Sequence, residues 1–423
     1  MDVIFIWIYL TKTPKIVERQ NQNFLFMKIV ILSVWYSEKM GYIENCLPKS
    51  LAKLGHDVHV VSSTAQVYYN EPNYAQIYEP YLGKNIQEVG IKKIDGFTLH
   101  RIPFGYFFNK MYLKDLRKKL EEIQPDVVQT FDVFSFPTFQ GVYYKLFKKY
   151  KLFTANHTVA SVFPIYLEKK NSPLYKFAFF LTRTIPGRMI SWVTSRCYPA
   201  TVDAMEIAIK YYGVPKRKAK LACLGVDTDF FHPYDEKPEE IQLRNKMRSD
   251  LEFTDNDIVC IYTGRYTEGK NPLCLAHAID KLVEQGEPFK ALFMGNGPQL
   301  EEIKKMKGCI LHEFVPYHQL PKYYAIADVG VWPRQESTSM IDASACGLPI
   351  IISNRVQAKE RVEGNGLTYI ENDVEDMANM LLKMKDSGLR KQLGNFGKRK
   401  IIDHFSWDKI AKERIEDYQL FVK

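Results

Sequence analysis

Residues 331–350 read VWPRQESTSMIDASACGLPI, and they place an apolar strand, a polar loop, a short helix of small residues and a second apolar strand in succession. We expect the helix to cover 342–346 and to end at Gly347, because glycine favours the backbone turn that follows a helix. The carboxylates of Glu336 and Asp342 then flank a helix N-terminus. Backbone N–H groups at such a terminus favour phosphate, and carboxylates accept hydrogen bonds from hydroxyl groups. The segment therefore predicts an α/β fold with a site suited to a sugar nucleotide.

Strands and helices alternate on both sides of this segment. Apolar runs of strand length indicate strands at 28–33, 56–61, 97–103, 126–129, 153–156, 258–263, 290–294, 310–313, 329–331, 350–353 and 368–370. Helical spacing of apolar residues indicates helices at 42–54, 113–123, 272–284, 300–305, 320–325, 374–385 and 406–423. Such alternation predicts parallel sheets with helices on both faces, in two doubly wound α/β domains in tandem.

The length of 423 residues favours two domains, since single cores stop growing at about 250–300 residues. We expect an extension outside the fold at 1–26, a first domain at 27–225, a second at 226–405 and a final helix at 406–423. The start of the chain is apolar but too short to span a bilayer, and it lacks the features of a signal peptide. A short anchor that touches a membrane is the alternative interpretation of the extension. Two facing sheets would place a ligand cleft between the domains, at the carboxyl ends of the strands.

Charge is distributed unevenly along the chain. The net charge is +9, and residues 1–225 hold 31 Lys and Arg against 17 Asp and Glu, so the remainder is mildly acidic. A basic first domain indicates an anionic partner, for which a membrane surface or a phosphate-bearing acceptor is expected rather than nucleic acid. The seven cysteines form no Cys-x-x-Cys pair, which favours reduced thiols in a cytoplasmic protein over a zinc site.

A loop with two cations lies between a predicted strand and a predicted helix. It runs from Thr263 to Pro272, where Gly264 permits a tight turn and Arg265 and Lys270 bring positive charge. Cations stabilise a departing diphosphate, on which negative charge grows as a glycosidic bond breaks. The alternative is a solvated loop with ordinary surface cations.

Two further glycine-containing loops follow predicted strands. Gly295 and Gly297 lie in a short loop that lacks the third glycine of a dinucleotide fingerprint. They would let a base or ribose approach the backbone, and a plain turn is the equal alternative. Gly41, after the first strand, could contact donor phosphates or the acceptor, or simply belong to the loop that begins a helix.

Other polar groups have weaker patterns. His157 follows a strand and could donate to a sugar hydroxyl, although a structural role is the usual one for a lone histidine. The acidic pairs at 227–229 and 255–257 are interpreted as turns, so no catalytic metal is expected. The segment 177–192 mixes bulky apolar residues with arginines, which suits either a bilayer interface or a buried helix–loop–helix. We expect Pro186 and the glycine after it to break any single helix there.

These residues together resemble the retaining glycosyltransferases of family 4, which have the GT-B fold. The likeness runs from about Met27 to the end and is strongest after residue 224. It rests on the interdomain segment Leu224–Pro233, the pair Arg265 and Lys270, the loop Gly295–Pro298, the segment Asp342–Pro349 and the helix start Phe405–Trp407. The resemblance implies two Rossmann-like domains that face each other across a cleft, with a C-terminal helix crossing back to the first domain.

The resemblance also implies roles for individual residues. Arg265 and Lys270 would hold the diphosphate, Asp342 would bind the ribose, and the hydroxyl residues Ser337, Thr338 and Ser339 would line the nucleotide-sugar site. Glu336 would lie by the donor sugar, and His157 would contact that sugar from the other domain. One departure stands out: the family has two glutamates with seven residues between them, whereas five separate Glu336 from Asp342 and the second is aspartate. A strict alignment places Arg334 at the first position.

We expect a metal-independent enzyme that moves a sugar from a UDP- or GDP-sugar donor to the hydroxyl of a sugar or lipid-linked glycan acceptor, with retention of configuration. The nucleotide sugar is then a substrate, and no cofactor is expected. Surface polysaccharide or glycolipid biosynthesis would suit such an enzyme, in the cytoplasm or peripherally at the membrane. A sugar-nucleotide 2-epimerase of the same fold and a catalytically inactive binding subunit are the alternatives. A dehydrogenase is disfavoured because no full Gly-x-Gly-x-x-Gly follows the first strand.

Overall fold

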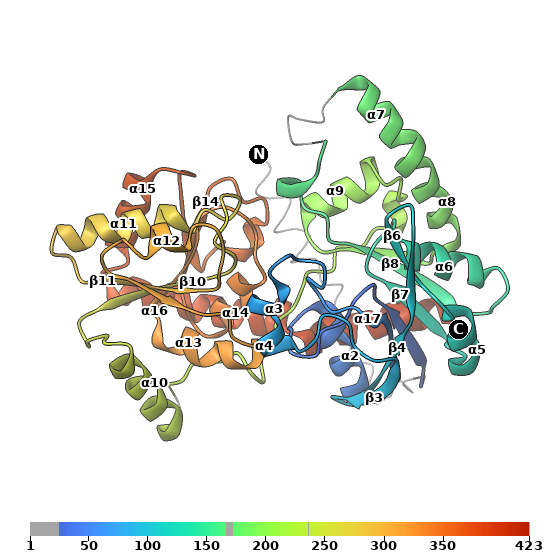
Figure 1. Ribbon diagram of the computed structural model, residues 1–423, viewed down its shortest axis with the longest axis horizontal. Coiled ribbons are helices and arrows are strands. Elements are labelled where there is room, and N and C mark those ends of the chain that lie inside the picture. Colours follow the sequence, from blue (N-terminus) through green and yellow to red (C-terminus); the bar gives the residue numbers. More distant parts are fainter. Residues whose placement is uncertain (1–24, 166–171, 236, 423) are drawn as a thin grey trace, which may run out of the picture.

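The computed structural model describes residues 25–165, 172–235 and 237–422, and these form two α/β halves that lie side by side (Figure 1). The extension predicted at 1–26 falls almost entirely on residues outside the described ranges. No helix in the described part of the chain is long and apolar enough to cross a bilayer. All seven cysteines are free.

The first half is built on a seven-stranded sheet, parallel except for β3. Its strands in spatial order are β3 (Gly90–Ile94), β4 (Phe97–Ile102), β2 (Asp57–Ser63), β1 (Lys28–Leu32), β7 (Val127–Thr130), β8 (Lys151–Asn156) and β9 (Arg196–Pro199). A separate hairpin joins β5 (Phe104–Phe107) to β6 (Lys110–Leu113). The helices are α2 (Ile43–Lys53), α3 (Tyr74–Ile77), α4 (Glu79–Leu82), α5 (Leu116–Ile123), α6 (Phe136–Lys145), α7 (Pro173–Phe179), α8 (Ile185–Val193) and α9 (Val202–Lys210).

The second half is built on a six-stranded sheet that is parallel throughout. Its strands in spatial order are β12 (Cys309–His312), β11 (Phe289–Met294), β10 (Ile258–Thr263), β13 (Val329–Trp332), β14 (Ile350–Ser353) and β15 (Gly366–Tyr369). Its helices are α10 (Pro238–Asp250), α11 (Pro272–Glu284), α12 (Leu300–Ile303), α13 (Leu320–Ile326), α14 (Ser339–Ala345), α15 (Val374–Lys383) and α16 (Ser387–Lys400). Every residue of β10 and β14 is buried, because helices cover both faces of the sheet.

The last helix, α17 (Trp407–Val422), returns to the first half (Figure 1). Its buried residues Ile410, Ile415 and Tyr418 belong to the core under β1 and β2. Arg414 donates to the Gln129 side chain of β7 at 2.8 Å. The core of the first half is therefore completed by the end of the chain.

The two crossings between the halves lie against each other. Val226 donates its N–H to the carbonyl of Phe405 at 2.8 Å, and Trp407 donates back to Val226 at 3.1 Å. A Cβ at Gly225 would come within 2.9 Å of the same carbonyl, so this close approach requires glycine. The chain thus leaves the first half and returns to it at one shared point.

The expected break at Pro186 does not occur. A helical run continues from Pro173 to Val193 as α7, a π-helical turn (Phe180–Thr184) and α8. Proline is tolerated in the first turn of a helix, and the wider π turn before it relieves the missing i→i−4 hydrogen bond. Gly187 packs tightly, since a Cβ there would lie 2.1 Å from the carbonyl oxygen of Tyr212.

Candidate active site

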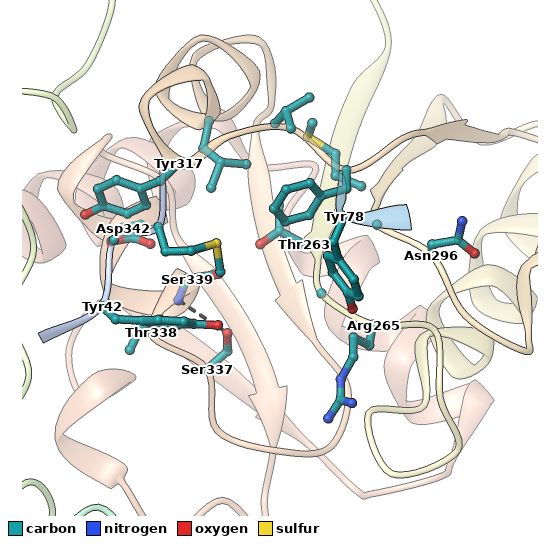
Figure 2. A pocket seen from close by; sticks show the side chains of 18 of the residues that line it. Tyr42, Tyr78, Thr263, Arg265, Asn296, Tyr317, Ser337, Thr338, Ser339 and Asp342 are labelled. Atoms are coloured by element: carbon teal, nitrogen blue, oxygen red, sulfur yellow. Dashed lines mark hydrogen bonds between the residues drawn. The ribbon is translucent and has the colours of Figure 1, made fainter. Parts of the chain in front are cut away.

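A cavity of about 410 Å³ lies where the carboxyl ends of the second sheet face the first half (Figure 2). Of the residues predicted from sequence, it brings together Gly41, Gly264, Arg265, Lys270, Gly295, Ser337, Thr338, Ser339 and Asp342. The three predicted residues that do not line it are Gly297, Glu336 and His157. The predicted donor-binding residues thus converge from four loops separated by up to about 300 positions.

Arg265 supplies an unpaired positive charge to the cavity. It follows β10, where Gly264 at φ 152° turns the chain and the hydroxyl of Tyr262 donates to the Arg265 carbonyl at 2.9 Å. Its guanidinium is exposed, and within the described residues it makes no ion pair. Figure 2 shows it beside Tyr78 of the first half. Burial raises the pKa of the Tyr78 hydroxyl, and the positive charge of Arg265 offsets part of that rise. A fixed backbone with a free guanidinium suits an anionic ligand.

Lys270 sits deeper on the same loop. Burial lowers the pKa of its ammonium group to about 8. The ammonium donates a hydrogen bond to the backbone carbonyl of Glu336 at 2.8 Å. Its amide also bonds the carbonyl of Thr267 at 3.0 Å, which fixes the turn before α11. A partly buried cation is expected to gain from a phosphate partner.

The second glycine loop packs on the first. A Cβ at Gly295 would lie 2.1 Å from the Gly264 carbonyl oxygen, and one at Gly297 would lie 2.5 Å from that of Tyr266. Both glycines have φ between 140° and 160°, which other residues rarely adopt. Gly295 lines the cavity, whereas Gly297 holds the two loops together behind it.

The loop before α14 lines the cavity with hydroxyl groups. The helix begins at Ser339, three residues before the predicted start at 342. Its first amides are already engaged: Met340 bonds the carbonyl of Ser337, Ile341 and Asp342 bond that of Thr338, and Ser339 bonds the Ser337 hydroxyl. These amides are therefore not free for the predicted phosphate contact, and the loop lines the cavity with the hydroxyl residues Ser337, Thr338 and Ser339.

Asp342 lies at the bottom of the cavity, beneath the ring of Tyr317 (Figure 2). Burial raises the pKa of this carboxyl well above its ordinary value, and the charge of Arg361 offsets part of that rise. A protonated or hydrogen-bonded carboxyl here can pair with a hydroxyl of a bound ligand, which relieves the cost of its burial.

The first half closes the cavity with the loop after β1. The ring of Tyr317 lies so close to Gly41 that a Cβ at that glycine would be 2.1 Å from it. The amide of Tyr317 also bonds the carbonyl of Lys39 at 3.2 Å, which joins the two halves at the backbone. Gly41 is required here because the two halves approach closely.

Glu336 faces a second cavity of about 730 Å³ beyond Lys270. Its carboxylate accepts from the hydroxyl of Ser161 in the first half at 2.8 Å and from the backbone N–H of Gln357 at 3.2 Å. Arg334, the residue at the strictly aligned position, lines the same cavity. Glu336 therefore spans the cleft rather than lining the smaller cavity.

His157 comes just before the segment that contacts Glu336. Its ring lies 6.0 Å from that of Phe131. Burial lowers the pKa of the imidazole to about 4, and the positive charge of Arg414 adds to this effect. The ring is therefore neutral at pH 7, so one nitrogen can donate and the other can accept.

The acidic pairs have other partners. Asp227 pairs with Lys49 at 2.5 Å and Asp229 with Lys53 at 3.3 Å, so both join the junction to α2. Asp257 accepts from the amide of Thr254. No cluster of metal-ligating side chains occurs among the described residues.

Two family models match the chain. The one described as Glycosyltransferase Family 4 matches residues 47–230, and the one described as Glycosyl transferases group 1 matches residues 257–386. The chain belongs to glycosyltransferase family 4. The predicted family and the predicted enzyme class, a hexosyltransferase, are confirmed.

Relatives of this glycosyltransferase differ in how much of their length they share with it. The spore coat protein SA of Bacillus subtilis is 27% identical over 225 residues, which are 48% of this chain and 59% of that protein. An uncharacterised glycosyltransferase of Methanocaldococcus jannaschii is 25% identical over 404 residues, which are 92% of this chain and 97% of that protein. The first alignment therefore spans less than two thirds of the relative.

Solved structures confirm the predicted GT-B fold. A glycosyltransferase from Rickettsia africae has a TM-score of 0.68 at 15% identity and covers 94% of this chain and 99% of its own. HepE of Anabaena, solved in complex with UDP, has a TM-score of 0.66 at 14% identity and covers 93% of this chain and 100% of its own.

Several cavity residues of this glycosyltransferase were missed from sequence. Tyr68 and Tyr78 of the first half and Phe314 of the second line the cavity, and the rings of Tyr78 and Phe314 are 6.0 Å apart. The concentration of tyrosines between 68 and 81 is the signal that could have indicated them. Aromatic rings of this kind suit a base or a ribose.

Proposed function

We propose that the protein is a retaining glycosyltransferase that moves a sugar from a nucleotide-sugar donor to an acceptor hydroxyl. One observation carries the proposal: an unpaired Arg265 and a half-buried Lys270 face a cavity that both halves share. Two cations in a partly dehydrated cleft match the charge of a diphosphate leaving group.

The reaction would pass through a state that resembles an oxocarbenium ion. As the bond to the sugar lengthens, negative charge moves to the diphosphate, where Arg265 and Lys270 stabilise it. A single donor of this kind is worth ~3 kcal/mol of barrier height. The acceptor hydroxyl would attack from the face that the diphosphate leaves, and a phosphate oxygen would take its proton.

The state of the carboxyl groups supports attack on the same face over a covalent enzyme intermediate. Among the described residues that line the smaller cavity, Asp342 is the one carboxyl group, and burial favours its neutral form. The carboxylate of Glu336 already accepts from Ser161 and Gln357. A neutral or engaged carboxyl is a poor nucleophile.

The donor proposed is a UDP- or GDP-sugar, and the UDP bound to HepE supports a nucleoside diphosphate in this fold. The acceptor proposed is a sugar or lipid-linked glycan, in surface polysaccharide or glycolipid biosynthesis. The basic first half supports an acceptor with phosphate groups. A cytoplasmic protein that works without a metal ion, peripherally at the membrane, would fit this role.

A nucleotide-release assay with a panel of UDP-, GDP- and ADP-sugars tests the proposal. Release should depend on an acceptor, survive a metal chelator and give a product whose anomeric configuration, by NMR, is that of the donor. Conversion of the donor sugar without any acceptor would instead indicate the 2-epimerase. Calorimetric titration that finds no binding of any nucleotide would indicate an inactive subunit and overturn the proposal.

A further inference from the structure

Large apolar side chains on the outer side of the helical run from Pro173 to Val193 are exposed to solvent. We call six of them the apolar stripe: Leu174, Phe177, Leu181, Ile185, Met189 and Trp192, which are 41–79% exposed. They recur at steps of three or four residues, so they follow one side of the run. Contiguous exposed apolar surface of this kind marks an interaction site in a soluble domain.

The opposite side of the run fixes it to the first half. Ile190 and Ser191 are buried, and Gly187 lies against the backbone of Tyr212. The hydroxyl of Thr184 donates to the carbonyl of Tyr211 at 2.6 Å. The apolar stripe is therefore the outward side of a firmly packed element. Figure 1 shows the ribbon of α7 and α8 along one edge of the molecule.

The charged side chains on the helical run itself are all basic. No Asp or Glu occurs from residue 169 to residue 202, whereas Lys176 and Arg188 are exposed on the run itself. Arg183 lies 4.3 Å from the ring of Phe134, which connects the run to the aromatic residues before α6. An apolar surface on a helical run whose own charged side chains are all basic complements anionic headgroups.

A second apolar point projects from the hairpin of β5 and β6. Phe107 and Phe108 form its tip, and Phe108 is 86% exposed. Phe107 contacts Phe136 of α6, and α6 in turn packs on α8. Tyr106 of the same hairpin bonds the hydroxyl of Tyr69, whose neighbour Tyr68 lines the smaller cavity. The hairpin tip therefore connects the apolar stripe to the rim of the active site.

We propose that the apolar stripe and the hairpin tip rest together on an anionic bilayer surface. A second copy of this chain fits less well, because pairing the stripe with itself would bring Lys176 and Arg188 against their own like charges. A bilayer accepts aromatic and aliphatic side chains at the headgroup boundary while the basic side chains of the run stay in contact with phosphate. If the proposed function holds, this orientation would present lipid-linked acceptors to the cleft.

Vesicle flotation of the full chain tests the proposal. We expect flotation with phosphatidylcholine vesicles that contain phosphatidylglycerol, and much less with phosphatidylcholine alone, because each exposed cation adds attraction to an anionic surface. The double variant Phe177→Ser, Trp192→Ser should reduce partitioning about tenfold or more. A matched control is Ile370→Ser, Leu420→Ser, which removes two exposed apolar side chains elsewhere and should float as the wild type does.

The basic side chains of the run are tested separately. Lys176→Gln with Arg188→Gln should lower flotation on the anionic vesicles, while Lys304→Gln with Lys305→Gln, exposed in the second half, should not. Thermal melting and UDP titration should be unchanged in all four variants. Since flotation needs neither donor nor acceptor, its outcome is independent of whether sugar transfer is found.

Two results would overturn the proposal. One is wild-type protein that stays with the soluble fraction in both kinds of vesicle, and the other is a Phe177→Ser, Trp192→Ser variant that floats like the wild type. Sedimentation velocity tests the alternative, a second copy of this chain. If the wild type forms a dimer, the Phe177→Ser, Trp192→Ser variant does not, and neither binds vesicles, the apolar stripe is a contact between copies.

Discussion

Arg265 contributes charge to the cavity without contributing to the fold, since its guanidinium makes no ion pair within the described residues. We expect Arg265→Ala to lower kcat about a hundredfold, or ~3 kcal/mol of barrier height, and to leave the melting temperature unchanged. Steady-state kinetics and calorimetry measure the two effects. Arg399→Ala, at an exposed position of α16, is the control and should retain activity. Near-normal turnover by Arg265→Ala would show that Arg265 does not stabilise the diphosphate.

We expect loss of the proton from Lys270 to lower kcat/KM for the donor at alkaline pH. Its pKa is lowered to about 8 by burial, so the free enzyme loses this cation as the pH rises through that value. Because kcat/KM reports the free enzyme, kcat/KM for the donor should fall above about pH 8. Lys270→Arg stays charged throughout this range and should shift or abolish this fall. A fall that persists unchanged in Lys270→Arg would assign it to another group.

We expect Asp342 to lower the stability of the folded protein at neutral pH and to contribute to donor binding. The folded protein holds this carboxyl's proton more tightly than the unfolded chain does, so its contribution to stability is present below pH ~4 and is lost as the pH rises. Asp342→Asn stays neutral, so it should raise the free energy of unfolding at pH 8 by about 1 kcal/mol or more and weaken donor binding. Urea unfolding at pH 5 and pH 8, with nucleotide titration, measures both. If Asp342→Asn binds the donor as tightly as the wild type does, Asp342 does not bind the ribose.

At the scale of elements, α17 shows that the end of the chain is part of the first core. Ile415 is fully buried between α2 and the sheet, whereas Leu420 is 69% exposed on the same helix. We expect Ile415→Ala to cost 2–5 kcal/mol, in the range of about one buried side chain lost to a cavity. Leu420→Ala should stay within about 0.5 kcal/mol. Denaturant unfolding decides between the two, and equal losses would show that α17 does not pack as described.

Elements with strong local signals could be predicted from sequence. The apolar run of β10, the helix α11 that starts at Pro272 and the run of β14 match their expected ranges. α16 could not be predicted, because Gly394 and Gly397 lower its helix propensity. Both glycines are explained by tertiary packing, since a Cβ at Gly394 would lie 2.0 Å from the Gly347 carbonyl oxygen. The helical run through Pro186 was missed because a π-helical turn accommodates the proline and Gly187 packs against the backbone of Tyr212.

The donor side of the site could be predicted because its residues are local to three loops of one sheet. On the opposite side only Gly41 was predicted, because Tyr78 meets Phe314 and Gly41 meets Tyr317 only through the arrangement of the two halves. Periodicity within a sequence carries no information about such contacts. The amides of α14 were also beyond prediction, because the helix start depends on how Ser337 and Thr338 fold back.

At the scale of the whole molecule, a few polar contacts join the halves around the cleft. Lys49 pairs with Asp227 near the crossing, Tyr81 bonds Glu313 at 2.8 Å, and Ser161 bonds Glu336 at 2.8 Å. The last of these closes the cleft directly beside the larger cavity. These contacts are polar and lie at the margin of the cleft, so we expect the halves to separate for substrates and to close on them.

The most direct measurement is a crystal structure of the protein with the nucleoside diphosphate that the release assay selects. The account predicts both phosphates in the smaller cavity, with oxygens within hydrogen-bond distance, about 2.7–3.2 Å, of the Arg265 guanidinium and the Lys270 ammonium. It also predicts the ribose beside Asp342. A nucleotide bound elsewhere, or bound in the cavity with Arg265 and Lys270 turned to solvent, would contradict the account.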